Sequence, residues 1–464
     1  MNIYVLGIAG AGVSALVSML VSQGHSVSGS DEGVYPPVSS YLDRLGVRYA
    51  TRFDAANVPA HVDVAILGTS AKLGGGDNPE RAELIRRGVP CFTFAEFLAR
   101  HTEGRENIVI AGSFGKSSLT ALIAYLLRAA GRDPGYFIGA VPLDLATTGH
   151  WGGDPQMILE GDEYVVSLED RRSKFVLYHP QHTLISSIVH DHVNMFPTMA
   201  DYERPFAELV ALTPPEGLLV CARAYEPIHR LTAGRRVVWY GIGPGEGYSA
   251  EEIEIGEITR FVLTTPQGQR IPLATQLLGL HNVENIVGAA ALLLARGLVT
   301  PDDLAQAMPN FRGVARRLDK KTATSRVPAY EGFGSSYEKA RSAIEAVRLH
   351  FPERPLVVVF EPHTFSWRNA AARDWYATVF DGVARVILLP PPEHGAALHA
   401  QLSQAEIVDA VRAAGVAVDP VAGGAETLAH LDVLTGDEVV LLLSSGPLDG
   451  LAESAPRRLD ARFA

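Results

Sequence analysis

The sequence predicts an α/β protein of three domains. Short apolar runs rich in β-branched residues alternate along the chain with segments in which apolar residues recur at helical spacing. Glycine-rich turns follow two of these runs, near residues 7–12 and 112–115. The 464 residues are enough for about three domains of ordinary size. We expect domains at residues 1–103, 104–313 and 314–464.

The first domain opens like a Rossmann fold. A strand at 3–6 precedes Gly7, Gly10 and Gly12, a helix at 13–24 and a strand at 25–29 that leads to Asp31. Such glycines let a phosphate approach a helix N-terminus, and an acidic residue about 20 positions further on can accept ribose hydroxyls. The spacing is not the usual one for NAD, so a packing turn and a site for another nucleotide are equally open.

The rest of the first 100 residues completes one α/β unit. Strands are expected at 62–67 and 90–93, with a helix at 81–88 between them and a polar loop at 68–80 before that helix. The charged segment 101–106 is typical of a linker between domains.

The second domain is built around residues 106–131, which predict a strand, a phosphate loop and a helix. The loop has the short pattern Gly112-x-x-Gly115-Lys116-Ser117, because the first glycine of the strict eight-residue motif would fall at Ile110. Lys116 can reach terminal phosphates and Ser117 can ligate Mg²⁺. An ordinary glycine turn with a surface lysine is the alternative, but lysine is rare in this chain, contributing only six of the 40 basic residues.

A second polar group follows two strands of the same domain. Glu160, Asp162 and Glu163 come after a strand at 157–159, and His190, Asp191 and His192 end a strand at 183–189. Carboxylate and imidazole groups at adjacent strand ends suit Mg²⁺ bound to a polyphosphate. We expect Ser117, Glu160 and His192 as metal ligands, and the other four as weaker candidates. Acidic clusters that merely cap solvated loops are the alternative.

The third domain repeats the alternation, with buried strands expected at 356–360, 385–389 and 438–443 and helices between them. This pattern predicts a second Rossmann-like unit. Glu361-Pro362-His363 and Ser444-Ser445-Gly446 follow strands, where a parallel sheet presents ligand-binding groups. A solvated loop is the alternative for His363 and Arg368.

Composition limits the classes of partner. The 40 basic and 52 acidic residues include no basic block, so we expect no nucleic-acid partner. No apolar run is long enough for a membrane span, and the N-terminus lacks a basic leader region. Cys91 and Cys221 share no metal-ligand spacing, so we expect two core cysteines without a disulfide. A cytoplasmic monomer is the expectation.

Six motifs in order resemble the Mur ligases, the ATP-dependent amide-bond enzymes of peptidoglycan assembly: GSFGKSS, EGDEY, SSIVHDH, GLHNVENIVGAAAL, FRGVARRLD and FEPHTFSWR. The segments 34–42 and 160–180 most resemble the peptidoglycan-recycling branch, which joins UDP-N-acetylmuramate to L-alanyl-γ-D-glutamyl-meso-diaminopimelate. In contrast, DNPE (77–80) and EPH (361–363) are more similar to the sister enzyme that adds L-alanine alone.

The resemblance implies a role for each domain. The first domain would bind the UDP-sugar, the second would bind ATP and the third would receive the amino substrate, with hinges near 103 and 314. The implied UDP-sugar contacts are Gly7, Gly10, Gly12, Ser14 and Asp31. The implied ATP contacts are Gly112, Ser113, Gly115, Lys116, Ser117, Ser118, Asn282, Arg317 and Glu331. A helix N-cap is the alternative role for Asn282.

The implied chemistry is carboxylate activation. A carboxylate is a poor acyl donor, so ATP first converts it to an acyl phosphate, and an amine then displaces phosphate. Mg²⁺, Lys116 and Arg317 would offset the charge of the transferring phosphoryl group. His192, or a carboxylate near it, is the candidate general base. Residues 193–220 contain no lysine, so the carbamylated lysine that some family members use has no counterpart there.

Several positions depart from the family pattern. Ser113 and Phe114 stand where relatives have threonine and histidine, and Ser117 and Ser118 replace threonines. Gly332 falls where an aspartate would hold the ATP ribose, a role that Glu331 could take, and Ser335 and Ser336 replace two histidines. These changes keep three alternatives open: the L-alanine ligase, a catalytically silent nucleotide-binding relative, and a nicotinamide oxidoreductase.

Overall fold

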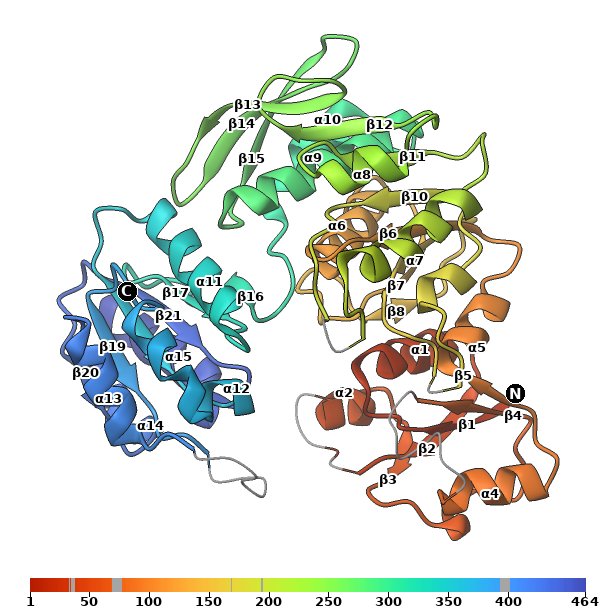
Figure 1. Ribbon diagram of the computed structural model, residues 1–464, viewed down its shortest axis with the longest axis horizontal. Helices are drawn as coiled ribbons and strands as arrows, with labels where there is room; N and C mark the ends of the chain where they lie inside the picture. Colours follow the sequence, from red (N-terminus) through yellow and green to blue (C-terminus); the bar gives the residue numbers. More distant parts are fainter. Residues whose placement is uncertain (33, 35–37, 69–76, 168, 193–194, 393–400) are drawn as a thin grey trace. The chain divides into compact units, whose positions relative to one another are not determined.

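A computed structural model shows an α/β chain with three separate sheets (Figure 1), as the sequence predicted. The structure describes residues 1–464 except 33, 35–37, 69–76, 168, 193–194 and 393–400. Most of the predicted polar loop at 68–80, and parts of the segments 34–42 and 160–180, therefore lie outside the described residues. Among the described residues, no helix is long and apolar enough to cross a bilayer.

The first sheet is parallel throughout and has the order β3-β2-β1-β4-β5. Its strands are β1 (Asn2–Leu6), β2 (Ser26–Ser30), β3 (Arg48–Ala50), β4 (Val64–Leu67) and β5 (Cys91–Thr93). Its helices are α1 (Ala11–Ser22), α2 (Val38–Arg44), η1 (Ala55–Asn57), α4 (Pro79–Arg86) and α5 (Phe94–His101). Helix α5 was not predicted, although Thr93 and Glu96 form a capping box at its start.

The second sheet has the order β15-β14-β13-β12-β11-β10-β6-β9-β7-β8. Its strands are β6 (Glu106–Ala111), β7 (Gly135–Phe137), β8 (Gly149–His150), β9 (Gln156–Glu160), β10 (His182–Ile185), β11 (Leu219–Ala222), β12 (Val238–Ile242), β13 (Tyr248–Glu254), β14 (Thr259–Thr264) and β15 (Arg270–Thr275). The helices of this region are α6 (Lys116–Ala129), η2 (Lys174–Leu177), α7 (Met199–Leu212), α8 (Glu226–Leu231), α9 (Leu280–Ala295), α10 (Pro301–Ala307) and η3 (Met308–Asn310).

The third sheet has the order β16-β17-β21-β18-β19-β20 and is parallel except for the β16–β17 pair. Its strands are β16 (Arg317–Lys320), β17 (Ala329–Gly332), β18 (Leu356–Phe360), β19 (Arg385–Leu388), β20 (Ala417–Pro420) and β21 (Val439–Leu443). Its helices are α11 (Tyr337–His350), α12 (Phe365–Arg368), η4 (Ala370–Ala377), α13 (Gln404–Ala413), α14 (Gly424–Asp432), η5 (Leu448–Gly450) and α15 (Leu451–Phe463).

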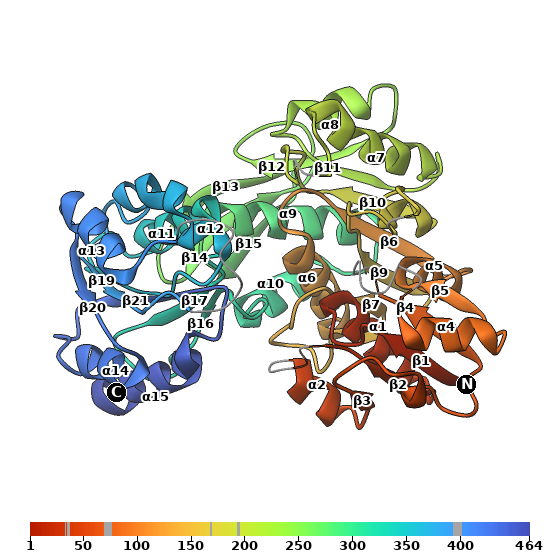
Figure 2. The ribbon, with the colours of Figure 1, turned by 60° about the horizontal axis from the view of Figure 1, so that its bottom comes forward.

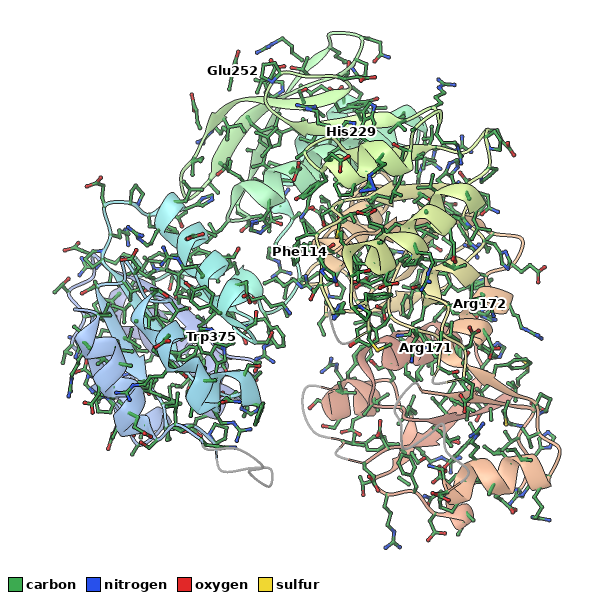
Figure 3. The ribbon with its side chains drawn as sticks, in the orientation of Figure 1. Phe114, Arg171, Arg172, His229, Glu252 and Trp375 are labelled. Atoms are coloured by element: carbon green, nitrogen blue, oxygen red, sulfur yellow. The ribbon has the colours of Figure 1, made fainter. Side chains whose placement is uncertain are left out.

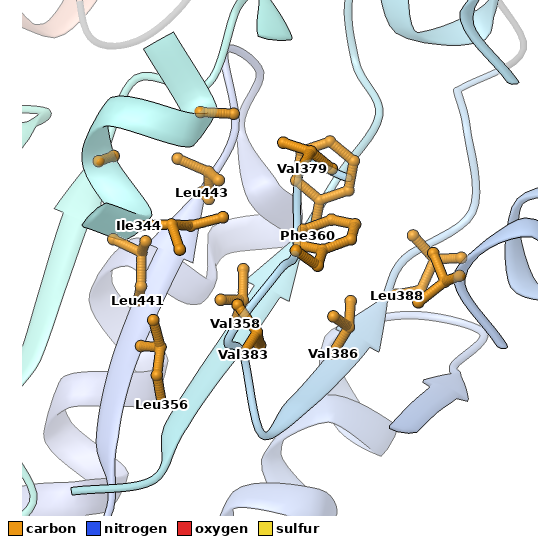
Figure 4. Close-up of a cluster of buried hydrophobic side chains, with 14 of the residues drawn as sticks. Ile344, Leu356, Val358, Phe360, Val379, Val383, Val386, Leu388, Leu441 and Leu443 are labelled. Carbon is orange, nitrogen blue, oxygen red and sulfur yellow. The ribbon is translucent and has the colours of Figure 1, made fainter. Parts of the chain in front are cut away.

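Both faces of the third sheet are buried, which explains its continuous apolar strands. Alternate residues of β18 and β21, such as Val358 and Leu441, pack against Ile344 of α11 in one core cluster (Figure 4). Their neighbours, such as Val359 and Leu442, belong to a second cluster that includes α15. Because side chains alternate across a strand, a strand covered on both faces must be apolar at every position.

The chain divides into two compact units. One comprises residues 1–253, 261–274 and 281–311, and the other comprises 254–260, 275–280 and 312–464. The first two sheets lie in the same unit, where α1 packs beside β7 and β8 (Figure 2). In this junction Ser18 donates to the Gly149 carbonyl at 2.8 Å, and the Tyr41 hydroxyl accepts from the Thr148 backbone at 3.0 Å. The predicted domain borders and hinges stay predictions.

Two local expectations need correction. Strand β10 ends at Ile185 rather than at 189, because residues 186–189 turn away to bond the phosphate loop. Cys221 is a buried core residue as expected, but Cys91 is only half-buried, and its thiol donates to the Val89 carbonyl. Both thiols are free, so the chain has no disulfide.

Candidate active site

A glycine-rich loop joins β6 to α6, as predicted, and places a helix N-terminus at the carboxyl edge of the second sheet. Gly112 has φ +142°, and a Cβ there would lie 2.2 Å from Ser186 Oγ, so only glycine fits. Gly115 has φ +82°, and its added Cβ would lie 2.8 Å from Asn285 Oδ1. The side chain of Phe114, labelled in Figure 3, is 52% exposed. The loop is therefore held tightly against its neighbours.

Lys116, the first residue of α6, is bound within the loop. Its ammonium group donates to the Gly112 carbonyl at 2.7 Å and pairs with Glu163 Oε2 at 2.8 Å. The Glu163 side chain is only 1% exposed, so the pair is largely shielded from water. A lysine at this point of a phosphate loop can reach the terminal phosphates of a nucleotide.

Ser117 and Glu160, two predicted metal ligands, are brought together. The Ser117 hydroxyl donates to Glu160 Oε1 at 2.7 Å, while the Gly139 amide donates to Glu160 Oε2 at 2.7 Å. The described residues contain no cluster of three or more acidic, histidine or cysteine side chains for a metal. Mg²⁺ on a nucleotide needs only one or two protein oxygens beside phosphates and waters, so the hydroxyl and carboxylate fit it.

His192 lies on the other side of Glu163. Its Nε2 is 3.5 Å from Glu163 Oε1, and its ring meets the Tyr164 ring edge-on at 4.7 Å. The hydrogen bond to Glu163 raises the pKa of the imidazole above its usual value, although partial burial opposes the shift. Its φ of +53° is a strained conformation for histidine, as is common at functional sites.

The other acidic candidates have partners of their own. Asp162 accepts from Lys174 Nζ at 2.7 Å, and although burial opposes it, this lysine lowers the pKa of the carboxyl. His190 contacts the Phe196 carbonyl through Nε2 at 2.8 Å. Asp191 accepts from the backbone N–H of His192 at 2.7 Å. These contacts give the three residues local structural roles.

Several residues that shape the loop were not predicted. The Tyr202 hydroxyl donates to Ser113 Oγ at 2.9 Å and lies 3.4 Å from Glu163 Oε1. Ser187 Oγ accepts from the Phe114 amide at 3.0 Å, and Ser186 Oγ donates to the Phe114 carbonyl at 2.5 Å. The serine pair in SSIVHDH was the only sequence signal. Tyr202 lies in a helix with no distinguishing motif.

The asparagine predicted as an ATP contact is close to the same loop. Asn282 is buried and lies in the first turn of α9, as its third residue, so the N-cap alternative does not describe it. Asn285 donates to Asn282 Oδ1 at 3.4 Å, and Asn285 in turn lies against Gly115. The two asparagines thus connect the start of α9 to the phosphate loop.

The glycine turn of the first sheet surrounds Asp31. Gly7, with φ +78°, turns the chain after β1, and Gly10 is the N-cap of α1. Asp31 Oδ2 accepts from the Ala9 amide at 2.9 Å, which places this carboxylate beside the turn. A Cβ added at Gly12 would lie 3.5 Å from the rings of Phe94 and Phe137, and Ser14 donates its N–H to the Gly10 carbonyl. The predicted UDP-sugar residues are therefore grouped at one edge of this sheet.

Two predicted ATP contacts, Arg317 and Glu331, belong to the second compact unit and are described within it. Arg317 is exposed at the start of β16. Glu331 is buried on β17 between two cations, with Arg316 Nε at 3.2 Å and Lys321 Nζ at 3.0 Å. Because both carboxylate oxygens have cationic partners, Glu331 is held in place within its own unit.

The strand ends of the third sheet form a second polar group. Glu361 Oε2 accepts from Ser444 Oγ at 2.5 Å and from the Leu448 amide at 3.1 Å, and its Oε1 lies 3.7 Å from His363 Nδ1. Arg316 donates to the carbonyls of Ser444 and Gly446. Arg368, for which a solvated loop was the alternative, is instead buried and donates to the Pro392 carbonyl.

A phosphate loop, an adjacent serine–glutamate pair and two further α/β sheets are typical of a nucleotide-binding α/β protein. Two family models match the chain. The Mur ligase family, catalytic domain, matches residues 2–106, and the Mur ligase middle domain matches residues 110–293. The chain belongs to the Mur ligase family, whose members are ATP-dependent ligases that join an acid to an amino acid.

Related proteins match nearly the whole chain. A UDP-N-acetylmuramate–L-alanine ligase of Xanthomonas axonopodis pv. citri is 30% identical over 467 residues, covering 97% of this chain and 94% of the relative. One from a Roseiflexus species is 32% identical over 407 residues, covering 82% of this chain and 83% of the relative.

Three solved structures have the same fold. A Thermotoga maritima UDP-N-acetylmuramate–alanine ligase has a TM-score of 0.79 at 21% identity and covers 100% of this chain and 99% of its own. A Psychrobacter arcticus murein peptide ligase has 0.68 at 21%, covering 100% of both chains. A UDP-N-acetylmuramate:L-alanyl-γ-D-glutamyl-meso-diaminopimelate ligase from Neisseria meningitides has 0.61 at 26%, covering 68% of this chain and 99% of its own.

Proposed function

We propose that this chain joins UDP-N-acetylmuramate to the tripeptide L-alanyl-γ-D-glutamyl-meso-diaminopimelate at the expense of ATP, as in peptidoglycan recycling. The observation that carries the proposal is segment 160–180, whose sequence resembles the recycling branch and whose Glu160 and Glu163 contact Ser117 and Lys116 of the phosphate loop. Lys174 of this segment pairs with Asp162 at 2.7 Å, and Ser173 donates to the Glu163 carbonyl at 2.5 Å. The segment therefore forms part of the phosphate site.

The residues of the site support separate roles in binding phosphate and in binding Mg²⁺. Lys116 would neutralise charge on the terminal phosphates, and Ser117 with Glu160 would hold Mg²⁺. Bound Mg²⁺ supplies a Lewis acid that offsets the charge of the polyphosphate. A muramate carboxylate oxygen would attack the γ-phosphorus and release ADP. The amine would then attack the acyl carbon, and phosphate would leave with that carboxylate oxygen.

The test is a panel of amines. Purified protein is incubated with UDP-N-acetylmuramate and Mg·ATP, and with the tripeptide, L-alanine or no amine, and ADP and ligated product are measured by mass spectrometry. The proposal predicts amine-dependent ADP and a product with the tripeptide, both lost in Lys116→Ala. Turnover with L-alanine and none with the tripeptide would contradict it.

The L-alanine ligase is the second candidate, and a specific observation favours it. The L-alanine ligases reported above are 30% and 32% identical to this chain and cover most of its length. In sequence, the DNPE and EPH motifs also resemble the L-alanine ligase. In the structure, Asn78 of the first motif caps α4, and Glu361 of the second accepts from Ser444. The same panel separates the two amines in one experiment.

A catalytically silent relative is the remaining outcome of the panel. Gly332 offers no carboxylate for a nucleotide ribose, and Glu331 is already paired with two cations. Binding of the UDP-sugar without ADP release with either amine would favour this outcome over both ligases.

A further inference from the structure

Glu163 contacts three groups of the phosphate site at once. Its Oε2 lies 2.8 Å from Lys116 Nζ, and its Oε1 lies 3.5 Å from His192 Nε2 and 3.4 Å from the Tyr202 hydroxyl. The side chain is 1% exposed, whereas those of Lys116 and His192 are 16% and 33% exposed. The sequence marked this glutamate only as a weak metal candidate, and the family-derived roles leave it unused.

The pairing has an electrostatic reason. A buried ammonium group without a counter-charge is strongly unfavourable, and so is a buried carboxylate without one. Glu163 and Lys116 provide this compensation for each other. The Glu163 backbone is also fixed, because Ser173 Oγ donates to its carbonyl at 2.5 Å. The carboxylate is itself buried and lies against His192 and Tyr202, which limits its freedom to follow Lys116 elsewhere.

A nucleotide must compete with this pair. Lysine at this position serves the terminal phosphates, which carry the same sign of charge as Glu163. A phosphate oxygen that approaches Lys116 therefore replaces Glu163 as its partner and experiences repulsion from the carboxylate. Mg²⁺ would bind beside Ser117 and Glu160 and not at the Glu163–Lys116 pair, because Glu160 is bonded to Ser117 and Gly139 rather than to Lys116.

We propose that Glu163 is a positioning residue that holds Lys116 and His192 in place when the site is empty and yields Lys116 to the nucleotide phosphates when ATP binds. The role uses only the ATP dependence of the family and does not depend on which amine is accepted. The proposal predicts that loss of the Glu163 carboxylate charge strengthens nucleotide binding and slows turnover.

The test variant is Glu163→Gln, which keeps the size and removes the charge. Calorimetry with Mg²⁺ and the non-hydrolysable analogue AMPPNP measures affinity without any amino substrate, and ADP release measures turnover. We expect the Kd for AMPPNP to fall about tenfold, since the repulsion of a buried neighbouring charge is removed. We expect kcat to fall by at least about tenfold, because Lys116 and His192 lose their common partner.

Two further variants make the result specific. Glu163→Asp retains the charge and is expected to keep the wild-type affinity better than Glu163→Gln. Glu203→Gln is the matched control, because Glu203 is a buried glutamate of helix α7 whose carboxylate pairs with Arg230 of α8 at 2.8 Å. It is expected to leave both Kd and kcat near wild type. Melting temperatures confirm that each variant folds.

Two results would overturn the proposal. One is weaker or unchanged AMPPNP binding in Glu163→Gln with a folded protein, which would assign Glu163 a purely structural role. The other is a higher Mg²⁺ concentration needed for half-maximal turnover in Glu163→Gln, which would make Glu163 a metal ligand. The AMPPNP binding experiment needs no amine. A result that contradicts the Glu163 proposal can therefore be distinguished from one that contradicts the tripeptide proposal.

Discussion

At the scale of single residues, we propose that phosphoryl transfer depends on the cation of Lys116. Replacing it with alanine removes a preorganised positive charge from a shielded site, which typically lowers turnover by about 10²- to 10³-fold. We expect Lys116→Ala to lose ADP release to that extent while UDP-N-acetylmuramate binding, measured by calorimetry, stays unchanged. A variant with near-normal ADP release would remove Lys116 from the mechanism.

Gly112 allows a second residue-scale prediction. An alanine here combines a φ of +142° with a Cβ only 2.2 Å from Ser186 Oγ, so we expect ~3 kcal/mol of lost stability and loss of AMPPNP binding. Gly24→Ala is the matched control, since its φ is +79° but nothing lies within 4 Å of an added Cβ. The control should cost about 1 kcal/mol and leave binding intact. Equal losses of stability and binding would contradict the steric argument.

The sequence identified candidate residues that follow strand ends, and the structure showed which side chains they contact. Lys116, Ser117 and Glu160 could be identified because glycine spacing and a strand end mark them locally. The Glu163–Lys116 pair could not, because its members are far apart in sequence and either could have bonded elsewhere. Tyr202 joined the site through Ser113, a contact 89 residues apart in sequence that no local pattern encodes.

At the scale of elements, one carboxylate fastens α15 to the loop before β17. Asp460 accepts backbone N–H groups from Ala323, Thr324 and Ser325 at 2.8–3.0 Å. Burial opposes the shift, but these three donors lower the pKa of Asp460 below its usual value. We expect Asp460→Asn to lose ~1 kcal/mol of stability at pH 7, as when a capping side chain is lost.

The pH dependence of that loss has a definite sign. A carboxyl whose pKa is lower in the folded state stabilises the protein fully above its unfolded pKa of about 3.9, and loses this contribution as pH falls through the folded value. The difference in unfolding free energy between wild type and Asp460→Asn should therefore be constant from pH 7 to about 5 and shrink below about pH 4. A difference that grows on acidification would contradict the stabilising role of the Asp460 carboxylate.

Strands were predicted well where burial on both faces makes every residue apolar. They were predicted less well where hydrogen-bond partners distant in sequence decide where the strand ends. The strands 356–360 and 438–443 were recognisable because both faces of the sheet are covered, so every position is apolar. Residues 183–189 were expected to continue as one strand because Leu184, Ile185, Ile188 and Val189 are apolar, yet Ser186 and Ser187 bond the phosphate loop and end the strand. The competing hydrogen bonds of two serines outweighed the apolar run.

At the scale of the whole molecule, the proposed function requires the amine-receiving domain to close on the nucleotide, which excludes water from the acyl phosphate. We predicted a hinge near residue 314, and this stays a prediction, because the chain crosses between the two compact units at five points, of which 311–312 is the last. The radius of gyration measured by small-angle X-ray scattering should decrease when UDP-N-acetylmuramate and Mg·AMPPNP are added together. An unchanged radius with saturating ligands would contradict closure.

The central claim is that ATP activates the muramate carboxylate at the phosphate loop, and isotope transfer tests it most directly. UDP-N-acetylmuramate with ¹⁸O in its carboxylate is converted with Mg·ATP and the accepted amine, and the inorganic phosphate is analysed by mass spectrometry. If the carboxylate attacks the γ-phosphorus, each phosphate released with the amide carries one carboxylate oxygen. We therefore expect one ¹⁸O per phosphate formed by the wild-type protein. Phosphate released with the amide but without ¹⁸O would contradict the account.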